Sequence, residues 1–154
     1  MVCSIGILIF SAALLFFYFQ TVCQKILRRE FSYAYFQDVL KALDLQFPRL
    51  RKAVLDNADV SYSQAHLALE SDYLTLTYLM KKGNPERAKF SWHEKLLVSY
   101  FRVLLLFLPI RFAFRFHERK AVMQLTTILY HFANLVGERV LSAEAHGMAS
   151  GNQA

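Results

Sequence analysis

The sequence predicts an all-α protein in which a single N-terminal transmembrane helix is followed by a small helical bundle. Residues 1–24 include no Asp, Glu, Lys, Arg or His. Further along the chain, apolar residues recur at intervals of three and four, as one face of a helix requires. No stretch alternates apolar and polar residues for long enough to predict a strand. We therefore divide the chain into a transmembrane anchor (1–24), a helical domain (25–141) and a flexible tail (142–154).

The anchor is predicted from its length and its lack of charge. A helix needs about 20 apolar residues, at about 1.5 Å each, to cross the hydrocarbon layer, and Val2 to Val22 supplies them. A cleaved secretory signal would begin with basic residues and end in a pair of small residues. Neither is present, since Met1 to Ser4 is uncharged and Tyr18 to Cys23 lacks such a pair. We interpret the segment as a retained signal-anchor.

Charge beside the anchor predicts its orientation. Lys25, Arg28 and Arg29 follow the span and no basic residue precedes it. The positive-inside rule then places the N-terminus outside and the helical domain in the cytoplasm. The formal net charge of +6 suits a surface held beside anionic headgroups. We predict no nucleic-acid partner, because the sequence has no zinc-ligand spacing and no RNA-binding aromatic motif.

The two cysteines, Cys3 and Cys23, fall at opposite ends of the predicted anchor. They would lie about 30 Å apart along a helix, too far to form a disulfide. Cys23, at the cytosolic boundary, is a weak candidate for palmitoylation.

The first part of the helical domain is predicted to form two helices. Lys25 to Phe47 reads as one helix, either continuous with the anchor or separate from it, with Phe36, Leu40, Leu43 and Phe47 on one face. Pro48 is expected to end that helix and to begin a short basic one that reaches Leu55.

A longer helix is predicted from Ser61 or Ser63, either of which can cap free backbone N–H groups. Its core-facing residues recur at intervals of four, three and four: Leu69, Tyr73, Leu76 and Met80. The helix should end after Lys82, because Gly83 can adopt a left-handed cap and Pro85 prevents continuation.

A second, very apolar helix is predicted over about 92–108. Ser91 and Glu94 have the spacing of a capping box at its start. Between Leu96 and Leu108, Ser99 and Arg102 are the strongly polar residues. Pro109 should break or kink the helix, and 110–116 then mixes aromatic and basic residues.

Three interpretations of this apolar helix remain open: a buried bundle helix, an interfacial helix, or a second span. About ten Leu, Phe and Val at roughly −0.4 kcal/mol each give around −4, against about +3 for the central Arg102, so crossing is marginal. A span would also leave the basic residues beyond 110 outside. The residues predicted to contact membrane lipid are Trp92, Arg111, Phe112, Phe114, Arg115 and Phe116.

The last helix is predicted over His117 to Leu141. Its apolar residues repeat at intervals of three and four, a seam of coiled-coil type expected to lie against a partner helix: Val122, Leu125, Leu129, Phe132 and Val136. Gly137 weakens the predicted last turn. Ser142 to Ala154 is small and polar and is predicted to be flexible.

Residues with catalytic or ligating chemistry do not form a recognisable motif. His117 and His131 are 14 residues apart, about 21 Å along a helix, and cannot share a metal. The sequence has no Cys-x-x-Cys, no H-E-x-x-H, no G-x-S-x-G and no glycine-rich phosphate loop. We therefore predict no enzyme and no catalytic, cofactor-binding or metal-binding residue.

These expectations favour a non-enzymatic, membrane-anchored accessory or assembly subunit of an integral membrane protein complex, which presents amphipathic helices to its partner. The first alternative is a peripheral lipid-binding module that uses the basic and aromatic stretch 110–116. The second is a two-span membrane subunit carrying a cofactor ligand, with His66, His117 or His131 as the candidate.

Overall fold

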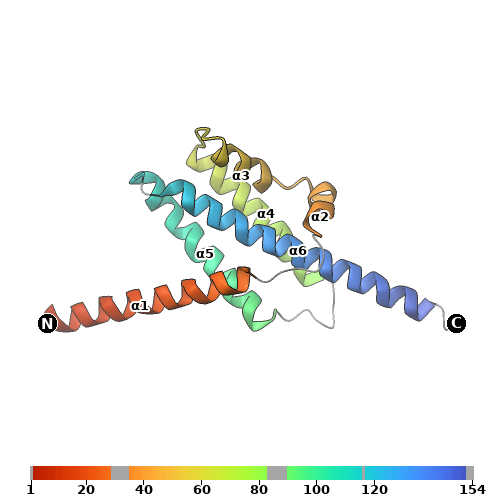
Figure 1. Ribbon diagram of the computed structural model, residues 1–154, viewed down its shortest axis with the longest axis horizontal. Coiled ribbons are helices and arrows are strands. Elements are labelled where there is room, and N and C mark those ends of the chain that lie inside the picture. Colours follow the sequence, from red (N-terminus) through yellow and green to blue (C-terminus); the bar gives the residue numbers. More distant parts are fainter. Residues whose placement is uncertain (1, 29–34, 83–89, 116, 152–154) are drawn as a thin grey trace.

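In the computed structural model every secondary-structure element is a helix, over the described residues 2–28, 35–82, 90–115 and 117–151. This confirms the predicted all-α fold. The helices shown in Figure 1 are α1 (Val2–Leu27), α2 (Phe36–Leu43), α3 (Phe47–Leu55), α4 (Tyr62–Lys82), α5 (Trp92–Ala113) and α6 (Glu118–Gly151).

Helix α6 is the centre of the bundle, and α2, α3, α4 and α5 all pack against it. Helix α1 packs against α5 and α6, and its N-terminal half projects away from the bundle (Figure 1). The predicted seam lies inside the chain, because its residues are between 0% and 3% exposed and face the other helices of the same bundle: Val122, Leu125, Leu129, Phe132 and Val136.

Helix α4 forms where the sequence predicts it. Its first residue is Tyr62, and the Ser61 hydroxyl accepts a hydrogen bond from the Gln64 N–H at 3.3 Å, which is the expected cap. The four residues predicted to face the core are all buried: Leu69, Tyr73, Leu76 and Met80. The predicted terminators, Gly83 to Pro85, lie outside the described residues.

The prediction of one helix from Lys25 to Phe47 is wrong. Helix α1 ends at Leu27 and α2 at Leu43, and Asp44 then adopts a left-handed conformation with φ 46°. Helix α3 begins at Phe47, ahead of Pro48, because the Asp72 carboxylate on α4 accepts the N–H groups of Gln46 and Phe47 at 2.8 and 2.6 Å. A side chain 25 residues away thus caps α3, and periodicity within 25–47 carries no sign of it.

The predicted end of the last helix at Leu141 is also wrong, because α6 continues to Gly151. Residues 142–151 contain no proline and include several alanines, which favour helix. Gly137 lies within the helix and not at its end. A Cβ at Gly137 would collide with Tyr35, so the glycine lets the chain beside α2 approach α6 closely.

Candidate functional site

Two helices of the described chain are long and apolar enough to cross a membrane, Cys3–Leu27 and Trp92–Ala113. The most apolar part of the first is 0% buried, whereas 28% of the second is buried inside the bundle. Every residue from Cys3 to Tyr18 is exposed, so α1 presents apolar side chains around its whole circumference. We call this segment, Cys3 to Tyr18, the free half of α1.

The other end of α1 is fixed to the bundle. Phe19 packs edge to face on Tyr100 of α5, with ring centroids 5.8 Å apart. Cys23 is 0% exposed, and Ile26 and Leu27 pack against the core. The direction in which the free half projects is therefore set by the bundle. The suggestion that Cys23 is available for palmitoylation is wrong, because its side chain is buried.

Helix α5 has one buried and one exposed face. The buried face packs in the core through Leu97, Tyr100, Phe101, Leu104 and Leu108. The central Arg102 lies outside this buried face, and its Nε donates a hydrogen bond to the Tyr73 hydroxyl at 3.1 Å. Pro109 does not end the helix, which continues to Ala113.

The exposed face of α5 is apolar near its C-terminal end. Four large side chains recur there, exposed by 73%, 45%, 51% and 78%: Leu106, Phe107, Ile110 and Phe114. We call these four residues the α5 face. Sequence reasoning included Ile110 and Phe114 in the stretch 110–116 but missed Leu106 and Phe107, although Leu106, Ile110 and Phe114 follow one another at intervals of four and so share one side of a helix.

The residues predicted to contact lipid do not form one surface. Arg111, Phe114 and Arg115 lie together where α5 ends, and Arg115, with φ 49°, lies in the turn toward α6. Phe112 instead packs on Tyr62 of α4, with ring centroids 5.6 Å apart. Trp92 is 71% exposed but begins α5, about 29 Å from Arg111 at helical rise. Phe116 lies outside the described residues.

Arg139 holds the start of α5 in place. Its guanidinium donates to the Met80 carbonyl at the end of α4 and to the Glu94 carboxylate in the first turn of α5, both at 2.6 Å. The second Glu94 oxygen accepts the Ser91 N–H at 2.9 Å, the bond from the glutamate in the predicted capping box. The Arg139 and Glu94 side chains are only 15% and 11% exposed, so the ion pair is largely withdrawn from water.

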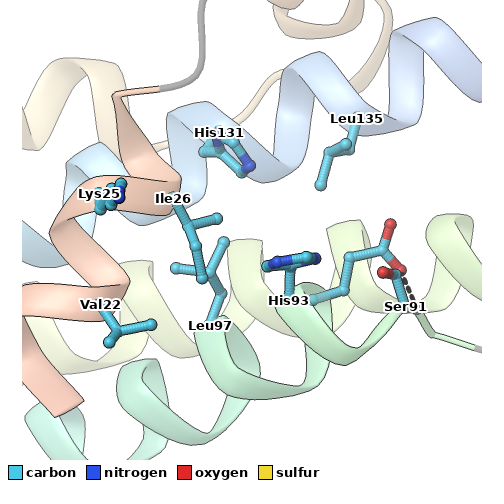
Figure 2. Close-up of a pocket in the computed structure, with 9 residues that line it drawn as sticks. Val22, Lys25, Ile26, Ser91, His93, Leu97, His131 and Leu135 are labelled. Carbon is cyan, nitrogen blue, oxygen red and sulfur yellow. Dashed lines mark hydrogen bonds between the residues drawn. The ribbon is translucent and has the colours of Figure 1, made fainter.

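A cavity of about 500 Å³ lies where α1 ends, α5 begins and α6 passes. Lys25, His93 and His131 supply polar groups to it, and Val22, Ile26 and Leu97 are among its apolar walls. Figure 2 shows both imidazole rings on the side facing this space. Among the described residues, no group of three or more His, Cys, Asp or Glu could hold a metal ion.

The three histidines considered as cofactor ligands are not brought together. His66 lies on α4, where its Nδ1 is 3.5 Å from Glu70. His117 is in the turn before α6 with φ 55°, and His131 is buried in the middle of α6. Each therefore sits in a different part of the fold.

Comparisons of the chain with protein-family models, with curated proteins and with solved structures found no match. Function is therefore argued from the chain's own residues.

Proposed function

We propose that this protein is a non-enzymatic accessory subunit of an integral membrane protein complex, anchored by α1 with its helical bundle on the cytoplasmic side. The observation that carries this proposal is the free half of α1, which is apolar and exposed on all sides. Water is a poor environment for so large an apolar surface, and a bilayer is a good one. The 26 residues of α1 rise about 39 Å, enough to cross a hydrocarbon layer of about 30 Å.

The orientation is inferred from charge. Lys25 and Arg28 stand at the end of α1 that joins the bundle, and the other end carries no basic side chain. Basic residues beside a span are retained in the cytoplasm. The bundle is thereby assigned to the cytoplasmic face, with the N-terminus outside.

A partner within the membrane is supported by one side of the free half. Ser4, Ser11 and Ala12 line a shallow hollow on α1, together with leucine and isoleucine side chains. Small residues let transmembrane helices approach one another closely, and their hydroxyl groups can hydrogen-bond across the contact. We assign this hollow to a transmembrane helix of the partner.

The matched pair Ala12→Leu and Ala13→Leu tests the assignment. Both alanines are exposed on α1, but Ala12 lines the hollow and Ala13 lies about 100° further round the helix. After purification in mild detergent, Ala12→Leu should lose the proteins that accompany the wild type, while Ala13→Leu should retain them. Equal recovery of the same partner from both variants would contradict the assignment.

Topology is tested separately on intact cells. A protease added outside should leave the bundle undigested, and the full chain should remain in membranes washed at alkaline pH. Digestion of the bundle by external protease would overturn the proposed orientation. Release of the chain by the alkaline wash would overturn the proposed anchor.

A further inference from the structure

The free half of α1 is too short to cross a membrane alone. Cys3 to Tyr18 rises about 24 Å, whereas the hydrocarbon layer is about 30 Å thick. The candidate span, Cys3–Leu27, continues past the free half and includes the next turn, where Phe19 is packed on Tyr100 of α5. Because this contact is part of the bundle, the adjoining side of the bundle comes to the depth of the lipid headgroups.

The fold brings the C-terminal end of α5 still closer to the membrane. Helix α5 passes the end of α1 near Tyr100, and its C-terminal half then runs back toward the side on which the free half projects (Figure 1). The turn into α6 thus lies further along that direction than the end of α1 itself. A membrane around the free half would meet this end of α5 before any other part of the bundle.

The side chains found there match a lipid leaflet. The α5 face is apolar and exposed by 45% to 78%. The basic residues Arg111 and Arg115 stand beside it, on the last turn of α5 and in the turn that follows. Long basic side chains keep their charge at the headgroups while their stems and apolar neighbours lie deeper. Anionic lipid is the complementary surface for such a cluster.

We propose that the α5 face is inserted among the acyl chains of the cytosolic leaflet, with Arg111 and Arg115 at the phosphates of anionic lipids. This inference rests on the proposed function, since it requires α1 to span the same membrane. The basic residues limit the depth of insertion, so α1 stands tilted in the bilayer, as membrane helices commonly do. The buried face of α5 stays on the bundle, and the helix lies in one leaflet without crossing the membrane.

Three single-tryptophan reporters test this proposal in the full chain. Trp92 is the chain's one tryptophan, so Trp92→Phe provides the background. Phe10→Trp reports on the anchor, Ile110→Trp on the α5 face, and Leu141→Trp on exposed α6. Each protein is reconstituted in vesicles of neutral and anionic phospholipid with brominated acyl chains, and far-UV circular dichroism checks that helicity is unchanged.

The proposal expects bromine to quench the reporters at positions 10 and 110 and to spare the one at 141. The Ile110→Trp emission should also shift to shorter wavelength. Adding Arg111→Glu with Arg115→Glu should weaken quenching at position 110 and leave it unchanged at position 10.

The opposing results separate the two proposals. Quenching at position 10 without quenching at 110 overturns the insertion of the α5 face and leaves the anchor standing. A blue-shifted but unquenched reporter at 110 means that protein covers the face, which also overturns the inference. Absence of quenching at position 10 overturns the anchor and, with it, the proposed function. Equal quenching of all three reporters overturns the inference, because burial would then not be specific to α5.

Discussion

Helices α1 and α5 are alike in length and hydropathy and differ in how much of each the bundle covers. Both are long and apolar enough to span a membrane, yet the most apolar part of α1 is 0% buried and that of α5 is 28% buried. Helix α5 carries polar groups whose partners lie in the bundle, because Glu94 binds Arg139 and Arg102 binds Tyr73. The free half of α1 has no charged side chain to be held in this way. Mean hydropathy therefore does not distinguish the two helices. The polar residues of α5 do, because their partners in the bundle hold one side of that helix against protein.

The largest effect is expected from charges placed in the free half of α1. Ile9→Arg combined with Leu14→Arg should release the chain from membranes, because each arginine near the centre of a span costs about 3 kcal/mol. The measurement is the fraction of protein that stays in membranes after an alkaline wash. Leu67→Arg combined with Leu74→Arg is the control, since both leucines are exposed on α4. Equal retention of the two double variants would mean that α1 is not the anchor.

Next in size is the loss of the ion pair that fixes the start of α5. Arg139→Ala leaves the Glu94 carboxylate and the Met80 carbonyl without their partner, and breaking a buried pair costs about 3–5 kcal/mol. Denaturation of the full chain in micelles, followed by circular dichroism, measures the free energy of unfolding. Arg49→Ala should change it by less than about 1 kcal/mol, because the Arg49–Asp44 pair is exposed. Membrane retention of the Arg139→Ala protein should be unchanged, since α1 is intact.

These contacts show which parts of the fold the sequence can predict. Helix α4 was predictable because its cap, its core residues and its basic last turn all lie within 61–82. The capping box at Ser91 and Glu94 was predictable for the same reason. The start of α3 was not predictable, because its cap, Asp72, lies 25 residues further along the chain. The role of Arg139 was not predictable either, because its partners lie 45 and 59 residues away. The α5 face was only partly predictable, since periodicity groups Leu106, Ile110 and Phe114 but does not say which side the bundle covers.

A smaller effect is expected at Asp72, which lies in the bundle and not in either candidate span. Asp72→Ala removes the acceptor for two N–H groups at the start of α3 and should lower the free energy of unfolding by about 2–3 kcal/mol. Asp72→Asn keeps an oxygen acceptor and should cost less. If the alanine and asparagine variants are equally stable, the proposed capping of α3 is wrong.

The same carboxylate predicts a pH dependence. Burial raises the pKa of Asp72 above its ordinary value of 3.8, although the two backbone N–H groups oppose this shift. The folded protein then binds the proton more tightly than the unfolded chain. The Asp72 contribution to stability should therefore fall as pH rises from about 3.8 through the folded pKa, and stay level above it. Unfolding measured across this range should show the fall in the wild type relative to Asp72→Asn, whereas parallel curves would contradict it.

A glycine-to-alanine substitution can be compared between the bundle, at Gly137, and the free half of α1, at Gly6. Gly137→Ala places a Cβ against Tyr35 and should lower the free energy of unfolding by about 1–2 kcal/mol, net of the gain in helix propensity. Gly6→Ala is the matched control, because nothing lies within 4 Å of the added Cβ. Its effect should be neutral or slightly stabilising. Equal effects at the two glycines would mean that Tyr35 does not approach α6 as closely as described.

The smallest effect is expected at the aromatic contact between α1 and α5. An edge-to-face aromatic pair such as Phe19 and Tyr100 is worth about 1 kcal/mol beyond its buried area. A double-mutant cycle with Phe19→Leu and Tyr100→Leu should recover this coupling in the free energy of unfolding, and Tyr100→Phe, which keeps the ring, should preserve it. Absence of coupling would mean that Phe19 and Tyr100 do not pack as described. The direction of α1 against α5 would then depend on buried Cys23, Ile26 and Leu27 alone, so the cycle measures how much this aromatic pair adds to them.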